Sequence, residues 1–136
     1  MAFVHGKSAQ FTLTDSGAVA RDLSAYISEI SFPRSIETAE TTAFGSNAKS
    51  YIVGLSDATI SLTGKFDATA DGYLAGVLGQ STLLAFVYGP AGSTAGNIKY
   101  TGSAIMTSYE VSATVGDAVS ASVQLQVSGA ITRTTY

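Results

Sequence analysis

The C-terminal part of the chain shows the clearest alternation of hydrophobic and polar residues. Apolar side chains occupy every second position of Val119–Ser128, and serine or glutamine fills the positions between them. A period of two over ten residues predicts a strand with one apolar and one polar face. Ser108–Val115 alternates in the same way, and Gly116-Asp117 separates the two runs. The pattern therefore predicts an antiparallel hairpin over residues 108–128.

Two shorter segments alternate in the same manner. They are Ala58–Thr63 and Ile27–Phe32, and Pro33 is expected to end or bend the second strand. The four segments together predict one continuous polar surface, which we call the polar face. Its side chains are small and uncharged, or acidic, and none is lysine or arginine. They are Glu29, Ser31, Thr59, Ser61, Thr63, Ser108, Glu110, Ser112, Thr114, Ser120, Ser122, Gln124 and Gln126.

Three further segments are predicted as strands of other kinds. Leu83–Tyr88 has no polar position, which is typical of a strand covered on both sides. The loop Gly89–Asn97 is rich in turn-forming residues, and Ile98–Met106 is expected to return beside the apolar strand. Near the N-terminus, Gln10–Thr14 predicts a short strand and Asp15-Ser16-Gly17 a turn.

One helix is predicted over residues 69–79. Ala70, Tyr73, Leu74, Val77 and Leu78 fall on one helical face. Thr69 or Asp67 is suited to cap its start, and Gly79 its end. Gly72 and Gly76 each weaken the helix by roughly 1 kcal/mol relative to alanine, so it needs packing, which we expect across one open end of a sheet sandwich.

The segment Glu37–Gly54 has no convincing period of either kind. Irregular segments longer than about 12–15 residues are uncommon in compact domains and are usually functional or mobile. Phe44, Tyr51, Ile52 and Val53 would be costly to leave in water. We interpret the segment as an arm that becomes ordered against a neighbouring subunit. The alternative is a plain β-hairpin that extends the sheet.

Length and composition limit the number of domains and the functional classes to which the protein can belong. The 136 residues fit one domain, residues 1–136, without repeats or a separate linker. Charged residues make up 12%, about half the roughly 25% of a typical soluble domain, which favours an assembly that buries part of the surface. The net charge of -3 argues against a basic nucleic-acid binder. No apolar run reaches the about 20 residues of a membrane helix, and Met1–Lys7 does not resemble a signal peptide, so the protein is expected to stay in the cytoplasm where it is made.

The residues offer little for catalysis or for binding a metal or cofactor. The chain has no cysteine, and its one histidine, His5, lies near no nucleophile motif. Asp67 and Asp71 could hold a cation, but acids at a helix start more often complement its N-terminus. Glu29 and Glu110 lack the aromatic platform of a sugar hydrolase. We therefore expect no enzyme, no catalytic or metal-binding residue and no cofactor.

A polar face without cations suits contact with a passing anionic polymer. Proteins hold phosphates with lysine and arginine, so a surface of serine, threonine, glutamine and a few glutamates would give low friction. An ordinary solvent-facing sheet of a β-sandwich is the alternative, because serine and threonine are common there too.

Three segments of the chain resemble the major tail protein, or tail tube protein, of long non-contractile-tailed bacteriophages. They are Ile27–Thr42, Tyr51–Asp67 and Tyr100–Val111, the last continuing through the final strand to Arg133. The resemblance implies a mainly β fold: a β-sandwich or barrel-like tail tube fold with one short flanking α-helix and a long arm between strands. It also implies hexameric rings that stack into a tube, with four strands per subunit lining the lumen.

The resemblance implies a structural virion protein in the phage tail, assembled in the host cytoplasm. The polar face would line the lumen through which double-stranded DNA passes during ejection, and the arm at residues 37–54 would contact other subunits. The expected partners are further copies of the chain and the tape-measure, tail-tip and tail-terminator proteins, with no membrane binding. The alternatives are a tube protein of type VI or contractile systems and a monomeric β-sandwich binding module.

Overall fold

The structure is a computed structural model that describes residues 3–15 and 17–136, so Ser16 of the expected turn lies outside the described residues. Among these residues strands predominate, and one short α-helix is present. The elements in chain order are η1 (Gly6–Ser8), β1 (Gln10–Thr14), β2 (Ala20–Asp22), β3 (Ile27–Ser31), β4 (Arg34–Glu40), β5 (Tyr51–Lys65), α1 (Ala68–Leu74), β6 (Leu84–Gly89), β7 (Ile98–Ser112) and β8 (Ser120–Thr135).

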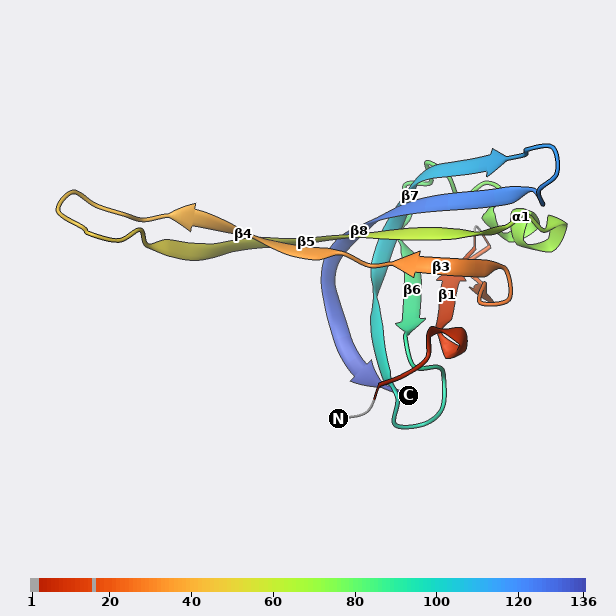
Figure 1. Cartoon of the computed structure of the whole chain (residues 1–136), viewed down its shortest axis with the longest axis horizontal. Coiled ribbons are helices and arrows are strands. Elements are labelled where there is room, and N and C mark those ends of the chain that lie inside the picture. Colours follow the sequence, from red (N-terminus) through yellow and green to blue (C-terminus); the bar gives the residue numbers. More distant parts are fainter. Residues whose placement is uncertain (1–2, 16) are drawn as a thin grey trace.

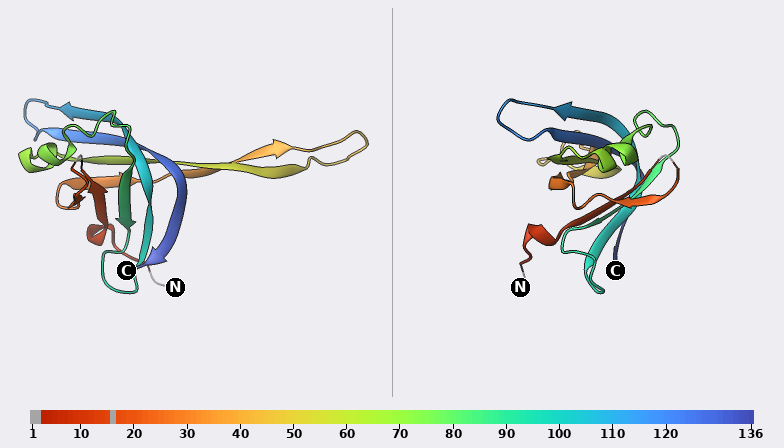
Figure 2. Two further views of the ribbon diagram at one scale, coloured as in Figure 1. Left: turned by 180° about the vertical axis from the view of Figure 1, so that it is seen from behind. Right: turned by 90° about the vertical axis from the view of Figure 1, so that its right-hand side faces the viewer.

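The strands form one antiparallel sheet that curls into a half-barrel. Its order is β2-β1-β6-β7-β8-β5-β3, and β4 pairs with β5 alone. The two longest strands of the body, β7 and β8, bend along their length, so that the two halves of the sheet face each other (Figures 1 and 2). This arrangement confirms the expected fold class, a mainly β, barrel-like fold with one short helix and a long arm.

Apolar side chains from both halves of the sheet fill the space inside the curl. Phe11 and Phe86 come from one half, Ile60 and Leu125 from the other, and all four are almost completely buried. No polar or charged residue among the described residues is buried. The core is therefore held by hydrophobic packing, which contributes about 25 cal/mol per Å² of apolar surface removed from water.

Two glycines allow the chain to curl and cross itself. Gly129 has φ +91° and lies where the pairing of β7 with β8 shifts register, so the irregularity bends β8 where the two halves meet. Gly64 lies where β3 crosses β5, and a Cβ atom there would come within 1.9 Å of the carbonyl oxygen of Tyr26. A larger residue at position 64 would therefore push β3 away from the sheet.

The strands with a polar face form as predicted, but several extend further than expected. The hairpin of β7 and β8 is confirmed, with β7 ending at Ser112, before the expected Val115. The two strands expected at 98–106 and 108–115 form one strand, and a register shift between Met106 and Ser108 marks the place where they join. The alternation breaks at that shift, which is why the sequence pattern divides a continuous strand into two.

The expectation that the strand at residues 83–88 is covered on both sides is wrong for the single chain. In β6, Leu84 and Phe86 are buried, but Ala85 between them is exposed. The sheet has only one layer at β6, and the outward-facing position 85 is occupied by alanine, a small apolar residue. An uninterrupted apolar run therefore did not require a second covering layer.

Helix α1 lies at the end of the sheet opposite the arm (Figure 1) and is shorter than the predicted 69–79. Asp67 caps its start as expected, because its side chain accepts hydrogen bonds from the backbone N–H groups of Thr69 and Ala70. The helix ends at Leu74, and the next turn contains Gly76 with φ +80°. That turn buries Val77 completely and leaves Leu78 half exposed, so their helix-like spacing was coincidental.

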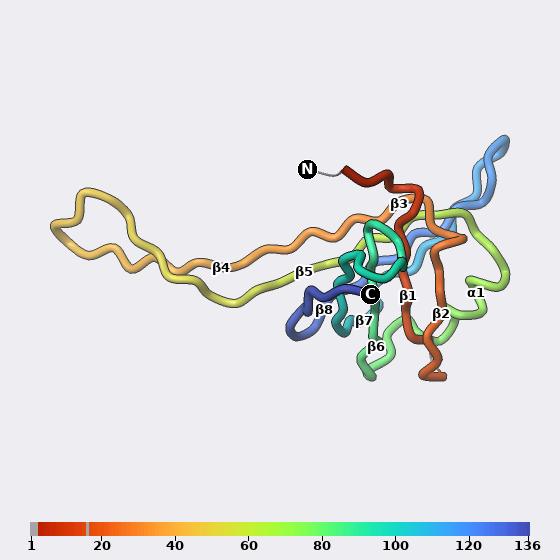
Figure 3. The backbone as a smooth tube through the Cα atoms, turned by 90° about the horizontal axis from the view of Figure 1, so that it is seen from below, coloured from red at the N-terminus to blue at the C-terminus, as the bar shows by residue number. Residues whose placement is uncertain are grey.

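The segment at 37–54 is the long arm of the fold, but it is not irregular. Residues of β4 and the first half of β5 pair in register, including Thr38 with Val53 and Glu40 with Tyr51. Only residues 41–50 form a loop, at the tip. The hairpin, the alternative interpretation of this segment, is what the structure contains, and it projects far beyond the body (Figures 1 and 3).

Candidate functional surfaces: a polar sheet face and an extended arm

Strand register brings almost all the residues of the predicted polar face together on one side of the sheet. Cross-strand partners in an antiparallel sheet point to the same side. Glu29 pairs with Thr63, Thr63 with Ser122, and Ser122 with Glu110, so the four form one row across β3, β5, β8 and β7. The other rows of the same face are Ser31–Ser61–Gln124–Ser108, Thr59–Gln126 and Ser120–Ser112.

Burial separates this face clearly from the core side of the same strands. None of the thirteen predicted residues is buried, whereas most of the residues that alternate with them in β5 and β8 are buried. Those inward-facing residues are Ala58, Ile60, Leu62, Val123, Leu125 and Val127. One residue departs from the prediction: Thr114 lies beyond the end of β7, in the turn that joins it to β8.

Hydrogen bonds within the face satisfy part of its polar groups. The Ser61 hydroxyl donates to Oε1 of Gln124 over 2.9 Å, and Nε2 of Gln126 donates to the Asp57 carboxylate over 2.6 Å. The Ser112 hydroxyl donates to the Glu110 carboxylate over 3.2 Å. Side chains that bond to one another along this face have fewer free polar groups with which to bind a ligand.

Two charged residues of this face were missed by the sequence reasoning. Asp57 and Lys65 continue the alternation of β5 by one step at each end of the predicted run, and Lys65 pairs with Ser120. Extending the period of two beyond residues 58–63 would have found both. The face therefore carries three carboxylates, those of Glu29, Asp57 and Glu110, against the one amine of Lys65.

Both edges of this half of the sheet are open among the described residues. At one edge, β3 pairs with β5 alone. At the other, β6 covers β7 only from Tyr100 to Ala104, so the end of β7 that carries Ser108, Glu110 and Ser112 pairs with β8 alone. Unpaired edge strands present rows of backbone N–H and C=O groups that can pair with another chain.

The arm exposes large apolar side chains on both of its faces. Tyr51 and Val53 lie on one face of β5 and Ile52 on the other, because neighbouring residues of a strand point to opposite sides. Their exposed fractions are 54%, 70% and 57%. Phe44 is fully exposed at the tip. Contiguous exposed apolar surface of this kind marks protein–protein contact sites.

An aromatic cluster fixes the base of the arm. The Phe32 ring packs edge-on against Phe86, Tyr88 and Tyr100, with ring centroids 5.9–6.0 Å apart. The Arg34 guanidinium, at the first residue of β4, lies 5.0 Å from the centre of the Tyr100 ring. Cation–π contacts of this kind contribute about 0.5–1 kcal/mol at exposed sites. No local sequence pattern indicates this cluster, since its members come from three separate segments of the chain.

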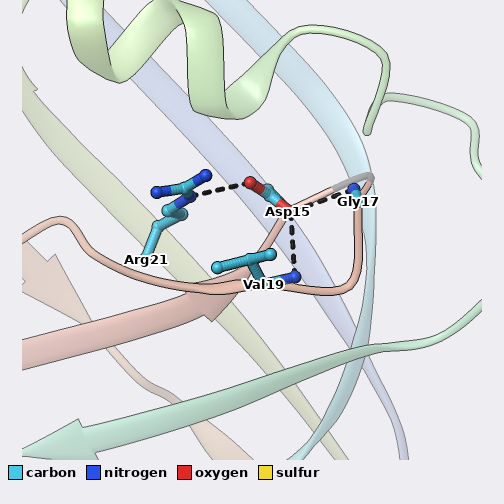
Figure 4. Close-up of polar contacts among 4 residues, drawn as sticks. All are labelled: Asp15, Gly17, Val19 and Arg21. Carbon is cyan, nitrogen blue, oxygen red and sulfur yellow. Dashed lines mark hydrogen bonds and ion pairs between the residues drawn. The ribbon is translucent and has the colours of Figure 1, made fainter.

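A charged contact connects the N-terminal strands to the helix. The Asp15 carboxylate accepts hydrogen bonds from Nε of Arg21, over 2.8 Å, and from the backbone N–H groups of Gly17 and Val19 (Figure 4). These bonds hold the pKa of Asp15 below its usual value, with the Arg21 bond as the largest cause. The Arg21 guanidinium also lies 4.6 Å from the centre of the Tyr73 ring in α1.

Tyr109 ties α1 to the sheet. Its hydroxyl donates a hydrogen bond to the Asp71 carboxylate over 2.8 Å. Burial, together with this bond, raises the pKa of Tyr109 to about 12. The contacts between Asp15 and Arg21 and between Tyr109 and Asp71 therefore hold elements of the fold together.

The described residues contain no group of three or more histidine, aspartate or glutamate side chains placed to hold a metal ion. None of the helices in the described part of the chain has the length and apolar character needed to cross a membrane.

Solved structures of several tail tubes share the fold. The tail of an empty gene transfer agent particle, determined with C6 symmetry, is 19% identical, with a TM-score of 0.80 over 98% of this chain and 100% of that one. The SPP1 tail tube is 16% identical, with a TM-score of 0.76 over 98% and 80%. A sheath–tube complex of an extracellular contractile injection system is 15% identical, with a TM-score of 0.63 over 93% and 89%. No curated protein sequence matches the chain.

The sequence itself matches a family model, described as phage tail tube protein, over residues 10–133. That match spans the curled sheet, the helix and the arm. The chain therefore belongs to the phage tail tube protein family.

Proposed function

We propose that six copies of this tail tube protein join edge to edge into a ring, that the rings stack into a hollow tube, and that double-stranded DNA passes through the tube. Membership of the family makes the chain a structural protein of the virion tail. The observation that carries the rest is the register of the polar face, whose rows run across four strands to two open edges.

The open edges support ring closure. When β3 of one copy pairs with the end of β7 of the next, the unpaired backbone groups of both strands become satisfied. Six copies would contribute about 24 strands to one barrel, and barrels of 16–18 strands already enclose an aqueous channel. The number six is taken from the C6 symmetry of the gene transfer agent tail, which has the same fold.

The chemistry of the polar face supports DNA passage. Proteins that grip nucleic acid do so mainly through lysine and arginine contacts to phosphate. The carboxylates of Glu29, Asp57 and Glu110 would instead repel phosphate, and Lys65 lies in the end row with Ser120 and Ser112. Neutral serine, threonine and glutamine side chains, several already bonded to one another, fill the rest of the wall.

The arm supplies the apolar surface for contacts between copies. Phe44, Tyr51, Ile52 and Val53 are exposed in the single chain, and both faces of the hairpin carry apolar side chains. A neighbour on each side would remove this surface from water. The other expected partners are the tape-measure, tail-tip and tail-terminator proteins. Capped ends are recorded for a related system, the tube-terminating cap of the anti-feeding prophage.

The experiment is electron microscopy of the purified protein at increasing concentration. The proposal predicts hollow tubes of stacked six-membered rings, with or without added tail-tip complex as a nucleus. A protein that remains monomeric in both conditions would contradict the proposal and support the alternative of a monomeric binding module. Tubes that form only with a contractile sheath around them would favour the second alternative, a tube of a contractile system.

A further inference from the structure

The N-terminal segment, residues 3–9, lies beside the open edge of β3. The two form a groove with a volume of about 500 Å³. The N-terminal segment lines one side of this groove, residues 27–30 of β3 line the other, and Tyr88 also contributes to the lining. The groove is therefore wide enough to admit side chains from another chain at the edge of β3.

The N-terminal segment flanks β3 without pairing with it. Its hydrogen bonds are local: the backbone N–H of Ser8 donates to the carbonyl of His5, that of Ala9 to the carbonyl of Gly6, and that of Lys7 to Nδ1 of His5. Among the described residues, β3 pairs with β5 alone. The edge of β3 on the side of the groove can thus accept a strand from another chain.

Two side chains of opposite charge line the groove, Lys7 from the N-terminal segment and Glu29 from β3. Both are exposed, and neither forms a salt bridge within the part of the chain that the structure describes. The Lys7 amine is therefore available to a carboxylate that enters the groove.

The end of β7, residues 106–112, has the features that this groove would accept. It contains Glu110 and no basic residue. Val111 is 45% exposed and points away from the polar face, because its partner Ala121 lies between two polar-face residues of β8. On the groove side, Ile27 and Ile30 are half-buried and pack against the core. The strand end and the groove are thus complementary in both apolar surface and charge.

Edge-to-edge joining of two copies brings two carboxylates together. Glu29 and Glu110 stand at opposite ends of one row of the polar face, so pairing of β3 with β7 of the next copy places them in the same row or close to it. Like charges directly opposite each other across two strands are destabilising. A cation beside the junction removes this penalty, and Lys7 is the lysine that lines the groove.

We propose that the groove receives the end of β7 from the neighbouring copy in the same ring. Val111 of that copy then packs against Ile27 and Ile30, and Lys7 lies between Glu29 and the Glu110 of the neighbouring copy. The incoming strand is held between β3 and the N-terminal segment. This inference rests on the proposed function and deepens it, because it makes the N-terminal segment part of the junction within a ring.

Carbodiimide cross-linking tests the contact with the native residues, because the reagent joins a lysine amine directly to a carboxylate in contact with it. Glu110 lies at the edge of the half-sheet opposite β3, so a link from Lys7 to Glu110 can join only two different copies. We expect assembled tubes to yield this link, identified by mass spectrometry of the digested protein, in a covalent ladder that stops at six chains.

Two arginine variants provide the controls. Lys7→Arg keeps the positive charge but removes the reactive amine, so its tubes should form normally without the link to Glu110. Lys49→Arg is the matched control, because Lys49 is also exposed but lies in the arm, and it should retain the link.

The remaining outcomes contradict definite statements. Tubes without a link between Lys7 and Glu110, or with that link in a ladder that continues beyond six chains, would refute the inference while the proposed function stands. A failure of the unmodified protein to form tubes, even with a tail-tip nucleus, would instead refute the proposed function.

Charge exchange provides a second, independent test. Lys7→Glu is expected to raise the concentration needed for tube formation about two- to fivefold, the range of an exposed ion pair, and this effect should shrink as the salt concentration rises. Combining Lys7→Glu with Glu110→Lys should restore the original concentration, because a cation again lies between two carboxylates. The unfolding temperature of the monomer should not change, since Lys7 forms no salt bridge within its own described chain. A single variant without effect, or a double variant that is not restored, would contradict the pairing.

Discussion

Replacing Val53 by threonine removes apolar contact from the arm while keeping its strand. Threonine is β-branched like valine, so the hairpin is retained. Val53 is 70% exposed in the single chain, which leaves most of its apolar surface to be buried by a neighbour. Full burial of valine is worth about 1.5–3 kcal/mol, so the remaining part is about 1–2 kcal/mol. Threonine forfeits roughly half of this and must also bury a hydroxyl, at a cost of about 1 kcal/mol.

Val53→Thr is therefore expected to weaken assembly by about 1.5–2 kcal/mol per subunit, which raises the critical concentration for tube formation by about 13- to 30-fold. The unfolding temperature of the monomer should stay within the small range typical of surface substitutions. Val19→Thr is the matched control, because Val19 is also exposed, directly precedes β2 and contributes only its backbone N–H and C=O groups to its hydrogen bonds with Asp15.

Sedimentation of tubes across a concentration series measures the critical concentration of each variant, and a thermal melt at low concentration measures the monomer. An unchanged critical concentration for Val53→Thr would refute the assignment of this face of the arm as an interface. An equal rise in the Val19→Thr control would show that the effect does not come from the arm.

Three further predictions follow from the polar face and the charged contacts. Glu110→Lys should make tubes retain double-stranded DNA at low salt and release it as the salt concentration rises, as a co-pelleting assay would measure. Glu110→Gln is the neutral control. Equal retention of DNA by both variants would argue against repulsion between the Glu110 carboxylate and the DNA phosphates. The pKa of Asp15 is lowered in the fold, so the contribution of Asp15 to stability is present above about pH 4 and is lost as the pH falls through the folded pKa. Asp15→Asn should therefore flatten the acidic part of the curve of unfolding temperature against pH. An unchanged curve would contradict a stabilising role for the contact between Asp15 and Arg21. Burial and the bond to Asp71 raise the pKa of Tyr109 from 10.0 to about 12, so the fold should lose stability as the pH rises between these values. Tyr109→Phe should remove this loss while costing about 1 kcal/mol at neutral pH. A wild-type protein without such a loss would contradict the raised pKa of the buried hydroxyl.

Sequence periodicity located the polar face because one side of its strands is buried. In β8, Val123 and Leu125 are fixed in the core, so the residues between them have to point outward. The same reasoning failed for the arm, where neither side of the hairpin is buried. Ile52 and Val53 point to opposite sides and are both exposed, so no alternation is present to be read. Strand formation there follows from β-branched and aromatic side chains and from pairing, not from an inward face.

Contacts between distant segments were beyond the reach of local patterns. The cluster at the arm base joins Phe32, Arg34 and Tyr100, and nothing in their sequence neighbourhoods indicates that they meet. The helix was predicted too long for a related reason. Val77 lies in the turn after the helix and is buried there, yet its spacing from Tyr73 and Leu74 is the spacing of a helical face. Asp57 and Lys65, by contrast, were one alternation step away from the predicted run.

The central claim is that the face formed by β3, β5, β8 and β7 lines the inside of a tube. Helical reconstruction of assembled tubes by electron cryo-microscopy tests it most directly, since the side chains of a polymer wall can be traced in such maps. The account predicts that the row Glu29–Thr63–Ser122–Glu110 points into the lumen and that the arms lie between subunits. A map with this row on the outer surface, or with the arms free in solvent, would contradict it.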